Sequence, residues 1–552
     1  MTSEQKSKRA SLWSGLLGSV LLAALVMFIG RTGLLYDLEL KTYDARFLVR
    51  GPMPVDHSDI VIVAIDDESF STLPARWPFP RSYHARLIHN LLAAGARLIV
   101  YDVQFTEPSD PVEDSLLALA TAEAHGNIIH AGKIAYYSDP RLNKVLTQAL
   151  LPIQSLQDAG AKIGIVNYAS DRDGFTRQYQ LFAVHGNTNY VPISMKALQI
   201  LDAMPDTVKM VHEKNVLLFG DRRIPLLTQS TMLINFYGPA ATFQTVSFAS
   251  VLDDQEFDLL KDDTDYMQWF LMSDEEFAVL EQILPPESVE AFRELRAENP
   301  FKDKIVFVGA SAAELQDNKK TPFYTYAPPG EHSRNEETPG VEVHANALQT
   351  LLDGSFIGNV PPLIEFLVTF LLAALVFVIN NSTRLLVGSL ATFGLIVLFG
   401  ISAVYLFIAQ RLWIAMVVPI LSTMTAYLGT TVYRFILEQK EKAMIRGMFS
   451  QYVPQKVVSE LINNPDMLKL GGEKRRMTAL FTDVAGFTSV SEKLTPEELV
   501  QLLNEYLSEM SKIVLDHEGI IDKYEGDLIM AEWGAPVYFE NHAELACRAA
   551  LH

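Results

Sequence analysis

The chain has 552 residues, of which 49% are hydrophobic and 20% are charged, and its formal net charge is −21. This length allows several domains, and the composition suits a soluble protein to which membrane-spanning segments have been added. The acidic balance argues against nucleic-acid binding, which favours basic surfaces. The one cysteine, Cys547, excludes a disulfide bond within these residues, and we expect it to be a packing residue of a terminal helix.

An apolar run lies close to the N-terminus. Residues 12–30 have about the length needed to span a bilayer, and Lys6, Lys8 and Arg9 precede them. We expect an uncleaved membrane helix over 12–30, with residues 1–11 in the cytoplasm by the positive-inside rule. A signal peptide is the alternative, but the run is long for one and no clear small-residue cleavage site follows it.

Residues 31–359 have the pattern of a globular α/β region. Apolar runs predict buried strands at 60–65, 98–103 and 305–309, and helical spacing recurs at 83–94 and 341–352. Residues 254–290 are rich in acidic side chains and are interpreted as an insertion.

Three carboxylates lie at the ends of these predicted strands. They belong to Asp66, Asp67 and Asp102. Such strand ends often line a ligand crevice in an α/β sheet. Helix caps and turns are the favoured alternative for each of the three.

The run IVIVAIDDESF, followed by RWPFPRSYHARLIHNLLAAGARLIVYDVQF, resembles the second class of CHASE domain, an extracellular sensor. The segment KIVFVGASA, followed by GVEVHANALQTLL, carries the same resemblance. The resemblance implies that residues 31–359 form an extracytoplasmic sensor for a ligand or partner that it does not identify.

Three more apolar runs follow the α/β region, at about 364–379, 385–408 and 412–435. Each approaches bilayer length, so we expect three further membrane helices within 360–435 and four in total. Arg434, Lys440, Lys442 and Arg446 lie at or after the end of the last run. The positive-inside rule then places the sensor outside the cell (inner) membrane and residues 436–470 in the cytoplasm, as a connector.

The last part of the chain contains a second pattern. Residues 477–481 predict a buried strand that ends near Asp483 and Gly486. Thr495 and Glu498 form a capping box before a helix for which Gly519 is a stop signal. Residues 520–524 and 528–533 predict a hairpin that turns at 525–527.

This hairpin, laid beside the strand, would bring Asp527 near Asp483. Two converging carboxylates suit a pair of Mg²⁺ ions that bridge a triphosphate. Taken singly, each aspartate is more simply explained as a turn former or a helix cap.

The two stretches together, FTDVAGFT and DKYEGDLIMAEWGAP, resemble the class III nucleotide cyclase catalytic domain over residues 471–552. By position, the resemblance implies that Asp483 and Asp527 bind two Mg²⁺ or Mn²⁺ ions, with backbone help from Val484. It also implies that the backbone of Val484, Ala485, Gly486, Phe487 and Thr488 contacts metal and polyphosphate. Lys523 matches the position that reads the purine, where adenylate cyclases typically carry Lys and guanylate cyclases usually Glu.

The resemblance implies a receptor-type adenylate cyclase that converts ATP into cyclic AMP and pyrophosphate as a homodimer. The alternatives are a guanylate cyclase and a receptor whose cyclase-like region only dimerises. We expect the fold class to be an α/β sensor, four membrane helices and the N-terminal part of an α+β ferredoxin-like cyclase domain.

The family's remaining catalytic groups would lie beyond His552, since the predicted helix at 541–552 has no stop signal. These groups include an Asn and an Arg that support the transition state. We therefore expect the 552-residue chain by itself to be inactive.

Overall fold

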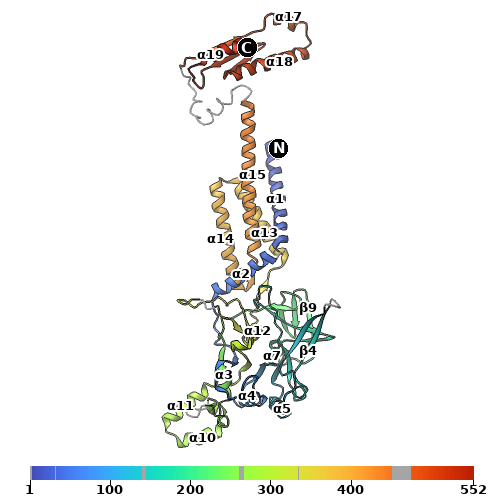
Figure 1. Ribbon diagram of the computed structural model, residues 1–552, viewed down its shortest axis with the longest axis vertical. Helices are drawn as coiled ribbons and strands as arrows, with labels where there is room; N and C mark the ends of the chain where they lie inside the picture. Colours follow the sequence, from blue (N-terminus) through green and yellow to red (C-terminus); the bar gives the residue numbers. More distant parts are fainter. Residues whose placement is uncertain (1–2, 31–32, 140–143, 260–265, 333–334, 450–473) are drawn as a thin grey trace. The chain divides into compact units, whose positions relative to one another are not determined.

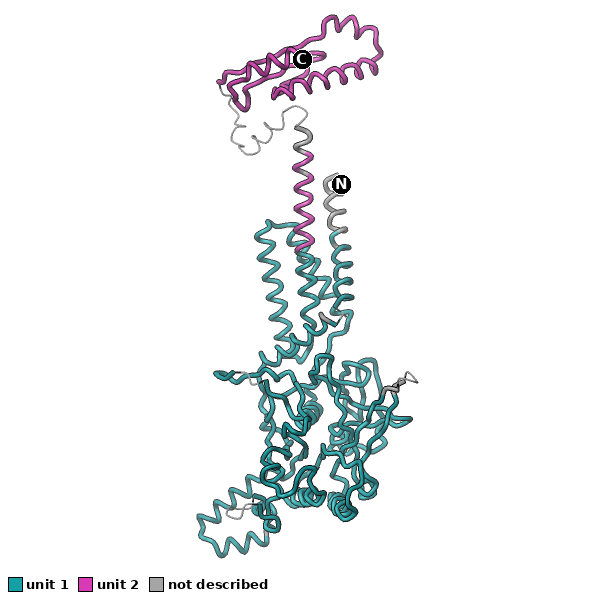
Figure 2. The backbone as a smooth tube through the Cα atoms, viewed as in Figure 1, with its two compact units in different colours: residues 1–427 teal, residues 428–552 magenta. Residues whose placement is uncertain are grey.

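The computed structural model describes residues 3–30, 33–139, 144–259, 266–332, 335–449 and 474–552. The chain forms two compact units, Met1–Tyr427 and Leu428–His552 (Figure 2). Most of the expected connector, from residue 450 onward, lies outside the described residues.

A seven-stranded sheet forms the centre of the first unit, and it confirms the predicted α/β fold and all three predicted strands. The strand order is β13-β1-β14-β2-β3-β4, with β5 paired to β3. Neighbouring strands are parallel except β3 and β4. The strands are β1 (Ile60–Ile65), β2 (Leu98–Asp102), β3 (Ile128–Asp139), β4 (Lys144–Leu150), β5 (Lys162–Ile165), β13 (Gln244–Ser247) and β14 (Ile305–Ala310).

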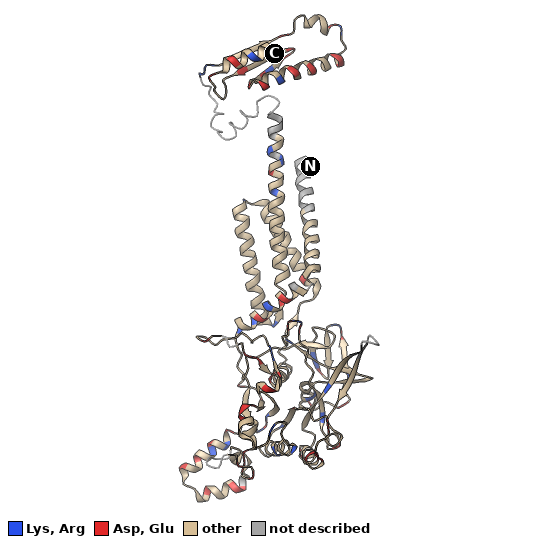
Figure 3. Cartoon of the chain, in the orientation of Figure 1, with Lys and Arg blue, Asp and Glu red and all other residues tan. Residues whose placement is uncertain are grey.

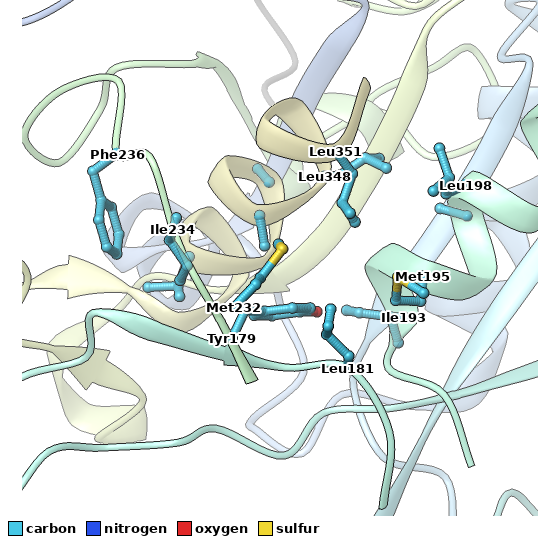
Figure 4. Packing of buried hydrophobic residues seen from close by; sticks show 14 of the residues in the cluster. Tyr179, Leu181, Ile193, Met195, Leu198, Met232, Ile234, Phe236, Leu348 and Leu351 are labelled. Atoms are coloured by element: carbon cyan, nitrogen blue, oxygen red, sulfur yellow. The ribbon is translucent and has the colours of Figure 1, made fainter. Parts of the chain in front are cut away.

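Both faces of this sheet are buried, which is why β1 is apolar at every position. Val61 and Val63 face one hydrophobic cluster with α4 (Arg81–Ala93), α5 (Pro111–Glu123) and α8 (Phe248–Leu252). Ile60 and Ile62 face a second cluster with α7 (Ile193–Leu201) and α12 (Gly340–Leu352), shown in Figure 4. The sheet is therefore the middle layer between two layers of helices.

Shorter elements complete the α/β body. The helices are α3 (Asp67–Thr72), α6 (Gln154–Asp158) and the 3-10 turn η1 (Ala313–Leu315). The strands are β6 (Gln178–Gln180), β7 (Ala183–His185), β8 (Thr188–Tyr190), β9 (Met210–Glu213), β10 (Val216–Phe219), β11 (Arg222–Pro225), β12 (Thr231–Leu233), β15 (Asn318–Lys319) and β16 (Thr338–Pro339).

The acid-rich insertion is helical and projects from the α/β body (Figure 1). It contains α9 (Gln268–Leu271), α10 (Asp274–Ile283) and the start of α11 (Pro286–Ala297), which extends past the predicted end at residue 290. Stacking of Trp269 on Phe292, with ring centroids 4.1 Å apart, ties α9 to α11.

Long helices flank the α/β body in sequence. They are α1 (Ser3–Gly30), α2 (Gly33–Arg50), α13 (Pro362–Ser382), α14 (Leu385–Gln410) and α15 (Val417–Phe449). Among the described residues, α13 and α14 are long and apolar enough to cross a membrane. Leu17–Gly30 and Leu35–Arg50, bent by 83° from each other, would make a third span if the pair counts as one. Figure 3 shows how sparse charged residues are along α13 and α14.

The structure thus supports two of the four predicted spans directly. Large apolar side chains on α13 and α14 point outward, among them Leu363 at 69% and Leu386 at 73% exposed, which suits contact with lipid. The predicted span at 412–435 is wrong at its start, because Leu412–Trp413 form β18, paired with β17 (Gly358–Asn359). Hydroxyl side chains, including Ser422 and Thr423, dilute the apolar character of α15, and its role as a span stays a prediction.

The second unit contains an antiparallel sheet of order β19-β21-β20. Its strands are β19 (Thr478–Thr482), β20 (Ile520–Glu525) and β21 (Leu528–Trp533), and its helices are α17 (Phe487–Ser491), α18 (Pro496–Asp516) and α19 (His542–Leu551). The predicted hairpin and the Thr495–Glu498 capping box are confirmed. The helix α18 ends at Asp516, three residues before Gly519.

Two sequence expectations about this unit are wrong. The strand β19 is not buried, and its Phe481 is 60% exposed. The physical reason is that α18 and α19 cover only one face of the sheet. Cys547 is exposed rather than packed. Its neighbours Ala546 and Ala549 occupy the core-facing side of α19, and Cys547 lies about 100° away from Ala546 around the helix.

One buried acid gives the first unit a pH-dependent contact. Glu342 of α12 is 2% exposed, and its carboxylate accepts hydrogen bonds from the backbone N–H groups of Ala241 (3.0 Å) and Thr242 (2.8 Å). Burial raises the pKa of Glu342 to about 7 despite these bonds. Between about pH 4.3, the usual pKa of a Glu in an unfolded chain, and pH 7, the folded unit therefore keeps a proton on Glu342 that the unfolded chain releases.

We predict that this proton stabilises the fold below about pH 4.3, and that the contribution is lost as the pH rises through 7. Its size is at most about 4 kcal/mol. Glu342→Gln cannot titrate, so its Tm should fall less than that of the wild type between pH 5 and pH 8. Measurement of Tm across this pH range in both proteins checks the prediction. Parallel curves of Tm against pH would contradict it.

Candidate active site

Asp483 follows directly on β19, where the chain turns toward α17. Its side chain is exposed. Gly486 has φ +75°, a left-handed conformation that favours glycine, and its carbonyl accepts from Ser489 N–H at 3.0 Å. The N–H of Phe487 donates to the carbonyl of Val484 at 3.1 Å. Residues 484–488 thus form a tight turn that lies next to a carboxylate.

Asp527 lies in the turn between β20 and β21, after Gly526 with φ +67°. Its Oδ2 accepts a hydrogen bond from the backbone N–H of Val484 at 3.1 Å, across 43 positions of sequence. The predicted approach of the hairpin to Asp483 is therefore confirmed, because Asp527 bonds to the residue that follows Asp483.

Strand register explains why these turns meet. In the antiparallel pair of β19 and β21, Thr482 lies opposite Ile529. The chain leaving β19 therefore meets the chain entering β21, so Asp483 and Val484 arrive beside Asp527. The site depends on this pairing and not on any local motif.

Lys523 lies on the sheet face opposite the helices, which we call the open face. Tyr524, next along β20, bonds through its hydroxyl to Ser511 of α18 at 2.8 Å and so faces the other way. Lys523 is opposite Met530, which is opposite Phe481, so the three side chains form a row across the strands. Lys523 and Phe481 are exposed and Met530 is half-buried.

The exposure of Phe481 is a feature that sequence reasoning missed. Alternation along β19 separates Phe481 from Leu480, but no local signal indicates which of the two faces receives the covering helices. An exposed aromatic side chain beside an exposed lysine gives the open face a mixed apolar and cationic surface.

The donor set at this site suits a hard cation shared with a bound ligand. No group of three His, Cys, Asp or Glu side chains converges within the described residues, so any cation here would need further ligands from water or substrate. Mg²⁺ is commonly held by one or two carboxylates together with water and substrate phosphates. Two aspartates and the nearby backbone fit that requirement.

The strand-end carboxylates of the first unit have other roles. Asp66 caps α3 by accepting from Ser69 N–H at 2.9 Å, and Asp67 is an exposed residue of the first turn. Asp102 is buried with its Oδ2 4.0 Å from His344 Nε2. Burial, together with repulsion from Asp317, raises the pKa of Asp102 well above its usual range.

The favoured alternative, caps and turns, is therefore confirmed for Asp66 and Asp67. A cavity of about 390 Å³ lies on this unit, and residues including Ile62, Ser311, Asn318 and Glu342 line it, but none of the three aspartates does.

Two protein families match the chain. The family described as "CHASE2 domain" matches residues 20–379. The family described as "Adenylate and Guanylate cyclase catalytic domain" matches residues 472–552.

Two adenylate cyclases are similar to a short part of the chain. "Adenylate cyclase 1" of Rhizobium meliloti is 41% identical over 103 residues, 19% of this chain and 16% of that protein. "Adenylate cyclase" of Anabaena cylindrica is 37% identical over 105 residues, 19% of this chain and 20% of that protein. The matched segment thus spans a fifth or less of these relatives.

Two solved structures also match. The guanylyl cyclase Cya2 is 40% identical over 15% of this chain and 42% of its own, with a TM-score of 0.15. The adenylyl cyclase CyaB from P. aeruginosa is 43% identical over 14% of this chain and 39% of its own, with a TM-score of 0.13.

Proposed function

The chain belongs to the CHASE2 domain family and carries a class III adenylate and guanylate cyclase catalytic domain, and from this premise we propose that it is a membrane-bound, receptor-type adenylate cyclase. The proposed reaction converts ATP into cyclic AMP and pyrophosphate by attack of the ribose 3′-oxygen on the α-phosphorus. The observation that carries the proposal is the bond from Val484 N–H to Asp527 Oδ2, because it holds the second carboxylate beside Asp483.

In this proposal Asp483 and Asp527 hold two Mg²⁺ or Mn²⁺ ions, with backbone help from Val484. Bound metal would supply Lewis acidity that lowers the pKa of the ribose hydroxyl and offsets the charge of the polyphosphate. The turn at 484–488 orients its backbone toward the phosphates, and the positive φ of Gly486 suits such a turn.

Lys523 selects the purine. Its ammonium is a donor only, so it can bond to the adenine N1 lone pair but would oppose the N–H of guanine. The apolar row of Met530 and Phe481 beside it suits the face of a base. A guanylate cyclase is the second candidate, because the family that matches residues 472–552 includes guanylate as well as adenylate cyclases. A receptor that only dimerises is less well supported, since both aspartates are present.

The open face also supports a dimer. Phe481 is 60% and Met477 38% exposed, and exposed apolar side chains of this size favour burial against a partner. We propose that a second copy of the catalytic domain covers this face. The outward-facing apolar residues of α13 and α14 support a multi-pass location in the cell (inner) membrane, with the CHASE2 domain as the extracytoplasmic sensor.

The metal assignment predicts that Asp483→Ala or Asp527→Ala in the full-length enzyme lowers cyclic AMP formation by about a hundredfold or more, the scale of losing one pre-organised charge. Asp527→Asn keeps an oxygen for Val484 N–H but not the charge, so it should be nearly as inactive. The assay uses Mg²⁺ and Mn²⁺ in turn. Asp516→Ala, an exposed acid at the end of α18, is the matched control. Near-normal turnover by Asp483→Ala or Asp527→Ala with either metal would contradict the assignment of these aspartates as metal ligands.

The purine assignment predicts that Lys523→Glu lowers kcat/KM for ATP by about tenfold or more, since a charge-assisted hydrogen bond is replaced by repulsion of the adenine N1 lone pair. A full switch to GTP is not expected from one substitution. Steady-state kinetics with both nucleotides measure the effect, and Lys512→Glu, on the exposed surface of α18, is the matched control. An unchanged ATP rate and KM would make Lys523 a surface residue only.

The orientation can be tested with Cys547→Ser as a cysteine-free background. Glu287→Cys, in the exposed insertion, should react with an impermeant thiol reagent in spheroplasts, because the sensor faces outward. Ser382→Cys, at the exposed last residue of α13, should react only after the membrane is opened. The reverse labelling pattern would invert the orientation and remove the sensor assignment.

A further inference from the structure

The helix α2 is embedded between the α/β body and the start of α15. Tyr43 and Phe47 are fully buried. Phe47 packs on Phe236 of the α/β body, with centroids 6.5 Å apart, and Tyr43 packs on Trp413 at 5.0 Å. Both rings also contact Phe407 of α14. This aromatic packing places α2 in contact with both the α/β body and the segment that leads into α15.

A salt bridge ties α2 to the α/β body. The guanidinium of Arg177, which is 1% exposed, donates from Nε and Nη2 to the two oxygens of Asp44, both at 2.7 Å. Asp171 and Asp173 accept from the same guanidinium at 2.8 Å. Arg177 thus has two carboxylates of its own loop, and α2 can release Asp44 without leaving a buried guanidinium unpaired.

A second polar contact, centred on Glu39, joins α2 to α15; we call this contact and the Asp44–Arg177 salt bridge the two joints. Glu39, which is 6% exposed, accepts through Oε2 from the backbone N–H groups of Met416 and Val417, both at 2.8 Å. Val417 is the first residue of α15. Arg46 donates to Glu39 Oε1 at 3.2 Å and to the carbonyl of Ile414 at 2.9 Å. The carboxylate therefore satisfies N–H groups that the first turn leaves without intrahelical partners, where the helix dipole also favours negative charge.

The two joints lie on different faces of α2. Asp44 follows Glu39 by five residues, which places it about 140° around the helix, whereas Arg46, seven residues on, returns to the face of Glu39. A roll of α2 about its axis cannot preserve both joints. The helix α15 contains residues of both compact units and extends to Phe449.

We propose that α2 is a strut that transmits the state of the sensor to α15. Release of Asp44 from Arg177 lets α2 roll, and the roll withdraws Glu39 from the first turn of α15. Its use as a control on cyclic AMP formation rests on the proposed function, but the mechanical coupling does not.

The coupling is tested by hydrogen–deuterium exchange on the 552-residue chain in lipid nanodiscs. Arg177→Gln removes the bidentate salt bridge with Asp44. Arg177→Lys keeps the positive charge but lacks the planar guanidinium that donates two parallel hydrogen bonds. Both should raise exchange at the amides of Met416 and Val417 by about tenfold or more, the scale of losing a charge-assisted bond. Arg86→Gln, which breaks a comparable pair with Asp254 away from α2, is the matched control and should leave these amides unchanged.

Reciprocity gives a second readout, because coupled sites affect each other equally. Glu39→Gln should raise exchange in residues 171–178 as well as in the first turn of α15. The proposal is overturned if Arg177→Lys loosens residues 171–178 and leaves α15 as in the wild type. It is also overturned if Arg86→Gln loosens α15 equally. If Arg177→Gln fails to fold, the exchange measured in Arg177→Lys alone tests the proposal.

Activity separates this proposal from the proposed function. In the full-length enzyme, Arg177→Lys should change basal cyclic AMP formation while Arg86→Gln does not. A full-length wild type without cyclase activity would refute the proposed function, and the exchange result would still decide the coupling. An active enzyme whose rate is the same in both variants would overturn α2 as a control on the reaction.

Discussion

The parallel pairing of β1 with β14 is the constraint on which the first compact unit depends. It joins residues 60–65 to residues 305–310 in unbroken register. The two strands lie between β13 and β2, so their pairing completes the sheet and allows both of its faces to be buried. Closing so long a connection costs chain entropy, which the burial of two apolar layers offsets. The helix α12 follows β14 and packs on one face, so the same pairing determines where the chain leaves the sheet toward α13.

Three ionisable groups buried in the interior of this unit are held by several hydrogen bonds each. Arg177 has three carboxylates, Glu39 has two backbone N–H groups and an arginine, and Glu342 has two backbone N–H groups. An unpaired buried charge would cost several kcal/mol, so each such contact restricts the geometry around it. Two of the three lie on or against α2. The segment between the α/β body and α15 is therefore held by directional bonds as well as by apolar packing.

In the second unit, strand register alone brings the candidate site residues together. Antiparallel register brings the end of β19 to the start of β21, and a hydrogen bond from the backbone N–H of Val484 to the Asp527 carboxylate then holds Asp527 against the turn after Asp483. The same sheet presents Lys523, Met530 and Phe481 as a row on the face that no described helix of this unit covers. Carboxylates at the strand ends and a mixed apolar and cationic surface on the open face suit the nucleotide and metal-bound polyphosphate that we propose as ligands. The proposed chemistry follows from this arrangement.

Much of the fold could be predicted from residue pattern alone. Unbroken apolar runs indicated β1, β2 and β14, and Thr495 with Glu498 indicated the start of α18, because burial on both faces and helix capping have local signatures. The approach of Asp527 to Asp483 could be predicted from the strand and hairpin patterns, whereas their proposed roles come from the family resemblance. Tertiary structure alone decided that Phe481 is exposed, that β18 replaces the start of a helix, that Cys547 faces solvent, and that Asp44 meets Arg177 and Glu39 meets Val417. Each of these depends on which distant segment covers a given face, and the periodicity of a single segment shows that a face is apolar or charged without identifying what packs against it.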